Sequence, residues 1–236
     1  MSIFPTRWSP RFPDRIQLYS MPTPNGQKAG IALEELELPY EPHRIDITRG
    51  DQFDPQFLRI NPNGKIPAII DPTAGDPLPI MESGAILLHL AEKTGRLLPR
   101  STAMRSRAIQ WVFFQVGSVG PMFGQLGHFS RRNKDHGDGQ YGLERYRAET
   151  ERLLRVLDRE LSGRQWLVDE YSVADIAIVP WLNGLDFYGV KPIVGYEGFE
   201  NVVAWADRFN ARPAVARGVL VCAESAPARA GDPVEV

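Results

Sequence analysis

Two short stretches of this chain decide its fold: Asn63–Ala68, with the sequence NGKIPA, and Glu82–Ile86, with the sequence ESGAI. The first places Pro67 at the head of an apolar run, and a strand tolerates proline only at its start or edge because proline has no N–H to donate. The backbone beside Pro67 is therefore expected to face a cleft, and its peptide bond is a candidate for the cis form. The second stretch predicts a helix with Ser83 as its N-cap residue. A free backbone edge beside a helix N-terminus suits a small peptide that carries a carboxylate.

The composition limits the kind of protein this can be. A chain of 236 residues suits one large domain or two small ones. A net charge of −2 argues against nucleic acid or an anionic membrane as the main partner, and no apolar run approaches the roughly 18 to 20 residues of a membrane span. The proline-containing segment Met1–Arg15 has no apolar core, so it predicts a flexible arm rather than a secretory signal.

Cysteine usage sets a further limit. Cys222 is the only cysteine, which excludes an internal disulfide, a Cys-x-x-Cys redox pair and a thiolate metal site. We therefore expect a cytoplasmic protein. If the protein carries out thiol chemistry, the thiol must arrive with a ligand.

The pattern over residues 16–98 predicts a small α/β domain. Strands are expected at 16–19, 41–47, 68–71 and 77–81, helices at 26–37 and 83–94, and a short helical stretch at 54–60. The order β-α-β-α-β-β-α is that of a thioredoxin-like domain, and its first crossover implies a parallel pair of strands.

Strand patterns end after Met104, and residues 104–222 are predicted to be entirely helical. Helices are expected at 105–129, with a kink near Gly117, Gly120 and Pro121, at 143–161, at 173–184, at 201–209 and from Pro213 onward. Residues 131–140 are predicted to form a loop and residues 223–236 a disordered tail. The expected fold is thus α/β plus all-α, with the two domains joined near residues 98–103.

The turn Met21–Gly26, with the sequence MPTPNG, is the strongest candidate for chemistry. It joins the first strand to the first helix, and two prolines and a glycine favour a defined turn. A thiol held there would meet backbone N–H groups, the positive end of a helix dipole and the side chains of Thr23 and Asn25. All of these favour the thiolate form. Spacing alone leaves open that Asn25 merely caps the helix.

Both short stretches resemble the N-terminal domain of the cytosolic glutathione transferases, and the similarity extends over roughly Ile16–Val221. In that family the residue before the cis-proline, here Ile66, pairs its backbone with the cysteinyl unit of glutathione. The Glu-Ser pair, here Glu82 and Ser83, holds the γ-glutamyl end. From the residues alone, the same pair could be a simple helix cap.

The turn around Thr23 and Asn25 is similar to that of the Nu class, which includes bacterial disulfide-bond oxidoreductases and their yeast nitrogen-regulator relative. The Nu class lacks the catalytic Tyr, Ser or Cys used elsewhere in the family. The resemblance implies that Thr23 and Asn25 activate the thiol of glutathione. Tyr19 and Ser20 lie nearby but at the end of the first strand, so we expect them to be structural.

The resemblance also implies roles for three charged or polar residues. Gln52, in the sequence GDQF, and Lys65 would bind the glycyl carboxylate of glutathione, although solvation at the surface is the alternative for each. Arg145, in the sequence LERY, would grip a second carboxylate bidentately if two glutathiones bind together. Its position away from the apolar stripe of its helix also allows it to face solvent.

Three functions remain open at this point. The first is a glutathione-dependent disulfide reductase, the second a transferase that conjugates glutathione to small electrophiles, and the third a non-enzymatic glutathione-binding module. The resemblance implies glutathione as cosubstrate, a small-molecule disulfide or electrophile as partner, and a homodimer. No metal is expected, because the four histidines are dispersed without ligand spacing.

Overall fold

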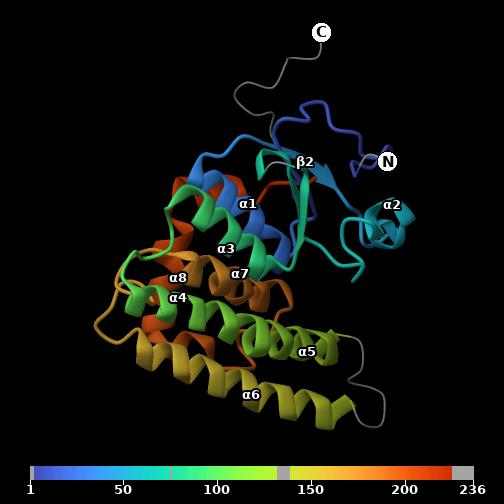
Figure 1. The fold of residues 1–236 in the computed structure, drawn as a ribbon. Coiled ribbons are helices and arrows are strands. Elements are labelled where there is room, and N and C mark those ends of the chain that lie inside the picture. The colour runs from blue at the N-terminus through green and yellow to red at the C-terminus, as the bar shows by residue number, and fades with distance from the viewer. Residues whose placement is uncertain (1–2, 75, 132–138, 225–236) are drawn as a thin grey trace.

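A four-stranded sheet followed by a bundle of helices forms the computed structural model, which describes residues 3–74, 76–131 and 139–224 (Figure 1). The strands are β1 Ile16–Ser20, β2 Tyr40–Arg44, β3 Ala68–Asp71 and β4 Leu78–Met81. They lie in the order β2-β1-β3-β4, with β1 parallel to β2 and the other two pairs antiparallel. The predicted fold class, a thioredoxin-like domain followed by an all-helical domain, is confirmed.

Alternation along the strands gives the sheet two different faces. Leu18 points to the face covered by α1 (Pro24–Leu36) and α3 (Ser83–Thr94) and belongs to the large core. Tyr19 points to the opposite face, where a smaller cluster forms with Phe57 of α2 (Pro55–Leu58). The short turns η1 (Asp51–Phe53) and η2 (Pro72–Ala74) complete this domain.

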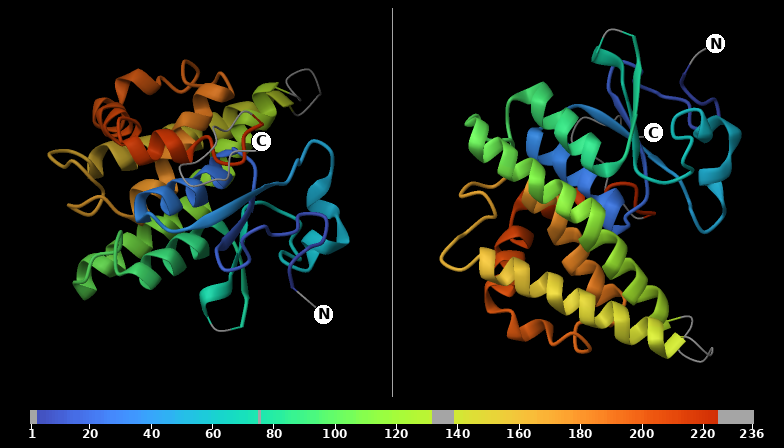
Figure 2. Two further views of the ribbon diagram at one scale, coloured as in Figure 1. Left: turned by 90° about the horizontal axis from the view of Figure 1, so that it is seen from above. Right: turned by 60° about the horizontal axis from the view of Figure 1, so that its bottom comes forward.

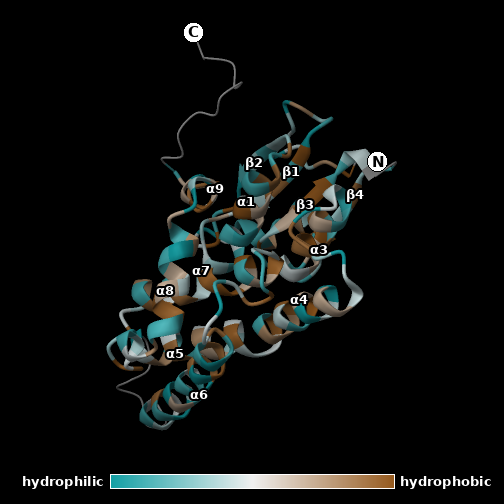
Figure 3. Cartoon of the chain, turned by 90° about the vertical axis from the view of Figure 1, so that its left-hand side faces the viewer, coloured by the Kyte–Doolittle hydropathy of each residue, from teal (hydrophilic) through white to brown (hydrophobic). Residues whose placement is uncertain are grey.

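The second domain consists of helices joined by loops, with no β-strand among its described residues. Its helices are α4 Thr102–Phe114, α5 Gly120–Arg131, α6 Gly139–Glu160, α7 Val173–Phe187, α8 Glu200–Asn210 and α9 Pro213–Gly218, and η4 (Tyr196–Gly198) is a short turn. At the position of the predicted kink, a π-helical turn, η3 (Gln115–Val119), joins α4 to α5. Helix α7 is almost wholly buried, whereas α6 carries mostly hydrophilic residues at the edge of the molecule (Figure 3). No helix in the described ranges is long and apolar enough to cross a bilayer.

Helix α1 lies between the sheet and the helical domain, as the views in Figure 2 show. Two close approaches depend on glycine. A Cβ on Gly218 of α9 would lie 2.4 Å from the Ile31 Cα of α1, and one on Gly184 of α7 would lie 3.0 Å from the Pro24 ring. Helix α1 therefore packs directly against α7 and α9 of the helical domain.

Helix α1 differs from the prediction in its first residue, and helix α3 differs in its N-cap residue. Helix α1 begins at Pro24 with Thr23 as its N-cap residue. Helix α3 covers the predicted residues, but Glu82 holds the N-cap position and Ser83 is the first helical residue. The expectation that Ser83 caps the helix is therefore wrong, because its hydroxyl accepts a hydrogen bond from Lys28 instead.

Other boundaries shift by a few residues. Strand β2 ends at Arg44 rather than residue 47, and α6 begins at Gly139, inside the predicted loop of residues 131–140. Residues 132–138 of that loop and residues 225–236 of the predicted tail lie outside the described residues.

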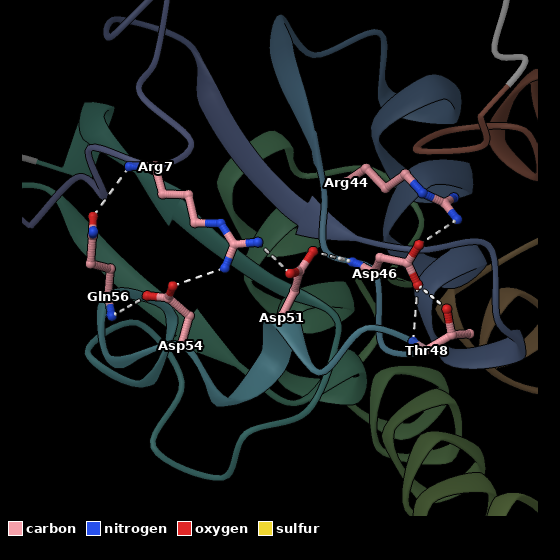
Figure 4. A network of polar contacts seen from close by, with 7 residues as sticks. All are labelled: Arg7, Arg44, Asp46, Thr48, Asp51, Asp54 and Gln56. Atoms are coloured by element: carbon pink, nitrogen blue, oxygen red, sulfur yellow. Dashed lines mark hydrogen bonds and ion pairs between the residues drawn. The ribbon is translucent and has the colours of Figure 1, made fainter.

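The N-terminal segment, predicted to be a flexible arm, is packed against the first domain in its described part (Figure 4). The Arg7 guanidinium lies 2.5 Å from the carboxylate of Asp51 and 2.9 Å from that of Asp54. The backbone N–H of Arg7 donates to Gln56 Oε1. These contacts join residues more than forty positions apart, which is why a local pattern did not show them.

Candidate functional site

The turn between β1 and α1 has a defined geometry. The Thr23 N–H donates to the Met21 carbonyl at 2.7 Å, and Thr23 Oγ1 accepts from the Gly26 N–H at 3.2 Å. A Cβ on Gly26 would lie 1.9 Å from the Met21 carbonyl oxygen, so only glycine fits there. Because Thr23 Oγ1 acts as the acceptor, its hydroxyl proton remains free to be donated beside the positive end of the α1 dipole.

Asn25 does not cap α1. Its Oδ1 atom accepts two hydrogen bonds, from Lys28 Nζ at 2.9 Å and from Trp181 Nε1 of α7 at 2.9 Å. The interpretation of Asn25 as a simple cap is therefore wrong. Its Nδ2 group has no hydrogen-bond partner among the described residues and is not enclosed by protein atoms.

Lys28, which the sequence reasoning missed, connects the separate parts of this site. Its side chain is fully buried, and Nζ donates to Ser83 Oγ at 3.2 Å and to Gln115 Oε1 at 2.5 Å as well as to Asn25. Burial lowers the pKa of Lys28 well below its usual value, and the charge of Glu82 partly opposes that shift. Its burial could have been predicted from its spacing, because Lys28 lies on the same face of the helix as the buried Ala32 and Leu36.

Gln115 lies in the π-helical turn η3 and is also buried. A Cβ on Gly120 would lie 2.6 Å from Gln115 Nε2, so the glycine leaves space for this amide. Insertions of this kind into α-helices are frequent at functional sites. Here the turn directs the Gln115 amide toward Lys28.

The backbone beside Pro67 has the expected form. The Ile66–Pro67 peptide bond is cis, and none of the hydrogen bonds among the described residues uses the main chain of Ile66. Ser83 is buried at the start of α3, whereas the Glu82 side chain is exposed on a backbone with φ +69°.

The two residues predicted to bind the glycyl carboxylate differ in their surroundings. Gln52 is half-buried; its Nε2 donates to the Ile47 carbonyl at 3.5 Å, while its Oε1 is enclosed without a partner among the described residues. Lys65 is exposed, and its main-chain carbonyl accepts from Asn61 Nδ2 at 2.6 Å.

Arg145 lies apart from the other predicted residues. It is exposed on α6 and lines an open pocket of about 710 Å³. The pocket is lined by Met122, Tyr141, Glu144, Arg145, Tyr146, Ala148, Glu149, Arg152 and Arg155. The structure therefore joins Asn25 and Ser83 through Lys28 but does not bring Arg145 into that group.

Two nearby side chains are unsuited to act as nucleophiles. Tyr19 is fully buried and stacks on His43 with ring centroids 4.7 Å apart, and burial raises the pKa of its hydroxyl. Burial also raises the pKa of the Cys222 thiol to about 12. Within the described ranges, no group of three or more His, Cys, Asp and Glu side chains is placed to hold a metal ion.

The sequence matches two family models. Residues 15–92 match the N-terminal domain of glutathione S-transferase, and residues 120–213 match its C-terminal domain. The chain belongs to the glutathione S-transferase family. This confirms the resemblance inferred from Ile66, Glu82 and Ser83.

Three similar proteins, one a curated relative and two of them solved structures, show which members of the family this chain resembles. The chain is 46% identical over 212 residues to the disulfide-bond oxidoreductase YfcG of Escherichia coli, covering 87% of this chain and 94% of the relative. A glutathione transferase family member from Pseudomonas fluorescens, solved with two glutathiones bound, is 48% identical with a TM-score of 0.89 over 91% of this chain and 96% of its own. A glutathione transferase from Pseudomonas putida, with one glutathione disulfide bound per subunit, is 47% identical with a TM-score of 0.88 over 90% and 94%.

The predicted relationship to the yeast nitrogen regulator is also confirmed. The nitrogen regulation fragment of the yeast prion protein Ure2p is 34% identical, with a TM-score of 0.77 over 88% of this chain and 96% of its own. Together with YfcG, it supports the predicted similarity to the Nu class.

Proposed function

We propose that this protein is a glutathione-dependent disulfide-bond reductase. The observation that carries the proposal is the pair of donors at the start of α1, the Thr23 hydroxyl and the Asn25 amide, in a chain whose one cysteine is buried. Two donors beside a helix N-terminus suit a thiolate supplied by a ligand. The name of YfcG, a disulfide-bond oxidoreductase, supports this activity. The two relatives solved with glutathione disulfide or glutathione bound support glutathione as the cosubstrate.

The proposed binding mode assigns the remaining residues to parts of glutathione. The main chain of Ile66 pairs with the cysteinyl unit. Glu82 accepts from the γ-glutamyl ammonium group, and Ser83 with the α3 N-terminus binds the adjacent carboxylate. Gln52 and Lys65 bind the glycyl carboxylate.

The reaction consists of two thiol–disulfide exchanges. The thiolate of one glutathione attacks a sulfur of a small disulfide, so a new S–S bond forms as the old one breaks, and the leaving thiolate takes a proton from solvent. A second glutathione thiolate attacks the glutathione sulfur of this mixed disulfide and releases the second substrate thiol, which is protonated in turn. Two glutathiones become one glutathione disulfide, and one substrate disulfide becomes two thiols. Arg145 is assigned to the second glutathione.

The test is a pair of assays on purified protein, with glutathione and either hydroxyethyl disulfide or chlorodinitrobenzene. Fast turnover of the disulfide with feeble conjugation is the expected result, and the reverse would support the alternative of a conjugating transferase. Silence in both assays, with glutathione still raising the melting temperature, would support a binding module without catalysis. The matched control is Cys222→Ala, which should retain activity because the buried thiol takes no part.

Family membership supports two further parts of the proposal, a homodimer and a cytoplasmic location. Sedimentation of the intact chain at the twofold mass would agree with the dimer, and a monomer across the working concentration range would contradict it. Fractionation of the source cells tests the location.

A further inference from the structure

The buried Lys28 ammonium meets hydrogen-bond acceptors from three separate elements. They are Asn25 Oδ1 of α1 at 2.9 Å, Ser83 Oγ of α3 at 3.2 Å and Gln115 Oε1 of η3 at 2.5 Å. An ammonium group has three N–H bonds and no acceptor, so each N–H has one partner. These acceptors favour the charged form, although burial still lowers the pKa of Lys28 well below its usual value.

These bonds decide which way two neighbouring polar groups face. Protonated Lys28 and the Trp181 indole N–H are donors only, and both point at the same atom of Asn25. That atom must therefore be the amide oxygen, which leaves the NH₂ group for another partner. Likewise, Ser83 Oγ accepts from Lys28, so its own proton is directed elsewhere.

The two remaining donors have no acceptor within the described part of the chain. Neither the Asn25 NH₂ group nor the Ser83 hydroxyl proton is donated to another side chain or carbonyl there. They lie at the N-termini of α1 and α3, where backbone N–H groups also favour an anion. One buried lysine thus supports two anion-directed donors on two different helices.

We propose that Lys28 is a positioning residue that, together with Trp181, presents the Asn25 NH₂ group to the sulfur of glutathione and the Ser83 hydroxyl to its γ-glutamyl carboxylate. This inference rests on the proposed binding of glutathione. Trp181 acts on Asn25 alone, whereas Lys28 acts on both residues. The charged groups involved are Lys28 and Glu82, and the remaining partners, Asn25, Ser83 and Gln115, are neutral.

The proposal predicts a distinct pattern in three variants. Lys28→Met keeps the length and apolar volume of the side chain and removes its donors, so it should raise the thiol pKa of bound glutathione by about 1 and weaken glutathione binding about tenfold. Trp181→Phe should raise the thiol pKa while leaving the dissociation constant of glutathione nearly unchanged. Ser83→Ala should weaken binding without moving the thiol pKa.

The experiment titrates thiolate absorbance near 240 nm for glutathione bound to the full chain, beside calorimetric binding and thermal melting. A Lys28→Met protein that melts cooperatively, with both the thiol pKa and the affinity unchanged, overturns the proposal. If Lys28→Met does not fold, the Trp181→Phe variant tests the proposal instead. An unchanged thiol pKa for glutathione bound to Trp181→Phe would refute the proposed orientation of Asn25. Wild-type protein that takes up no glutathione refutes the proposed function and this inference together, whereas wild-type uptake with unaffected variants refutes the inference alone.

Discussion

Lys28, between α1 and α3, and Arg145, in the pocket beside α6, are two cations in opposite surroundings. Lys28 is fully buried, and its three N–H bonds go to three neighbours on separate elements. Arg145 is exposed and has no hydrogen bond or ion pair with any described residue. The first cation is fixed by the fold, whereas no hydrogen bond from a described residue fixes the second.

The difference shows where substitutions should have large effects. A buried charge that loses a partner remains desolvated, which typically costs about 3 to 5 kcal/mol. An exposed charge is screened by solvent and salt, so its removal costs little unless a ligand uses it. The five predictions below, on four sites, test this contrast from the largest expected effect to the smallest.

Asp71 provides the strongest test that buried polar groups dominate stability. Its carboxylate is fully buried and lies 2.8 Å from His89 Nε2 and 3.0 Å from Lys93 Nζ. Asp71→Asn should lower the free energy of unfolding by about 3 kcal/mol at pH 7. Urea unfolding measures the loss, with the exposed Asp76→Asn as the matched control.

The same variant should show a pH dependence of known sign. Burial alone would raise the pKa of Asp71, but hydrogen bonds from Thr73, His89 and Lys93 hold it well below its usual value. A carboxyl whose pKa is depressed in the folded state stabilises the protein above its unfolded pKa, near 3.9, and loses that contribution as the pH falls further. The difference in unfolding free energy between Asp71→Asn and the wild type should therefore have its largest value at pH 7 and become smaller below about pH 4. An equal difference at pH 7 and pH 3 would contradict this account.

Asn25→Ala should have the largest effect on chemistry, because it removes the amide donor from the thiolate. We expect kcat/KM for disulfide reduction to fall about 100-fold, with most of the loss in kcat and little in glutathione affinity. Asn25→Asp is the sharper comparison, since it keeps an acceptor for Lys28 and Trp181 but has no donor. Equal losses in turnover and binding would remove Asn25 from its proposed role.

Arg145→Ala should have a smaller effect, confined to the second glutathione. The KM for glutathione in disulfide reduction should rise by about three- to tenfold, while the affinity for the first glutathione stays constant. Arg152→Ala is the matched control, because Arg152 lines the same pocket and is already paired with Glu149. Unchanged steady-state kinetics would show that Arg145 is outside the site.

Arg7→Gln should have the smallest effect, because the Arg7 side chain is largely exposed although it pairs with two carboxylates. We expect the melting temperature to fall by at most about 2 °C at low salt, and by less at about 0.5 M salt, where exposed charges are screened. Arg11→Gln serves as the control without such a pair. A large drop that salt does not reduce would show that the N-terminal segment is a structural part of the domain.

Local patterns predicted much of the fold. Strand β3 and helix α3 occupy the predicted residues. The short apolar run of β3, and the apolar face of α3 followed by Gly95, are both patterns of neighbouring residues. The start of α1 was missed by two residues, since Thr23 and Asn25 are both good capping residues and only their contacts separate them. The predicted site roles all remain predictions, namely those of Thr23, Asn25, Gln52, Lys65, Ile66, Glu82, Ser83 and Arg145.

The hydrogen bond between Lys28 and Gln115 could not have been predicted from the sequence. They are 87 positions apart, and Trp181 lies 156 positions from Asn25. Periodicity shows which face of a helix is buried, but it does not show which polar atom on another element will meet it. The exposed position of Arg145 on its helix was predictable, whereas its distance from the other site residues was not.

The sequence by itself determined the family, the order of the elements, the turn at Thr23–Gly26 and the cis-proline bond, because each depends on neighbouring residues. The tertiary structure alone decided that the Lys28 ammonium group donates hydrogen bonds to both Asn25 and Ser83. The physical reason is that a buried ammonium must find its acceptors wherever packing places them, and here packing draws them from three helical segments.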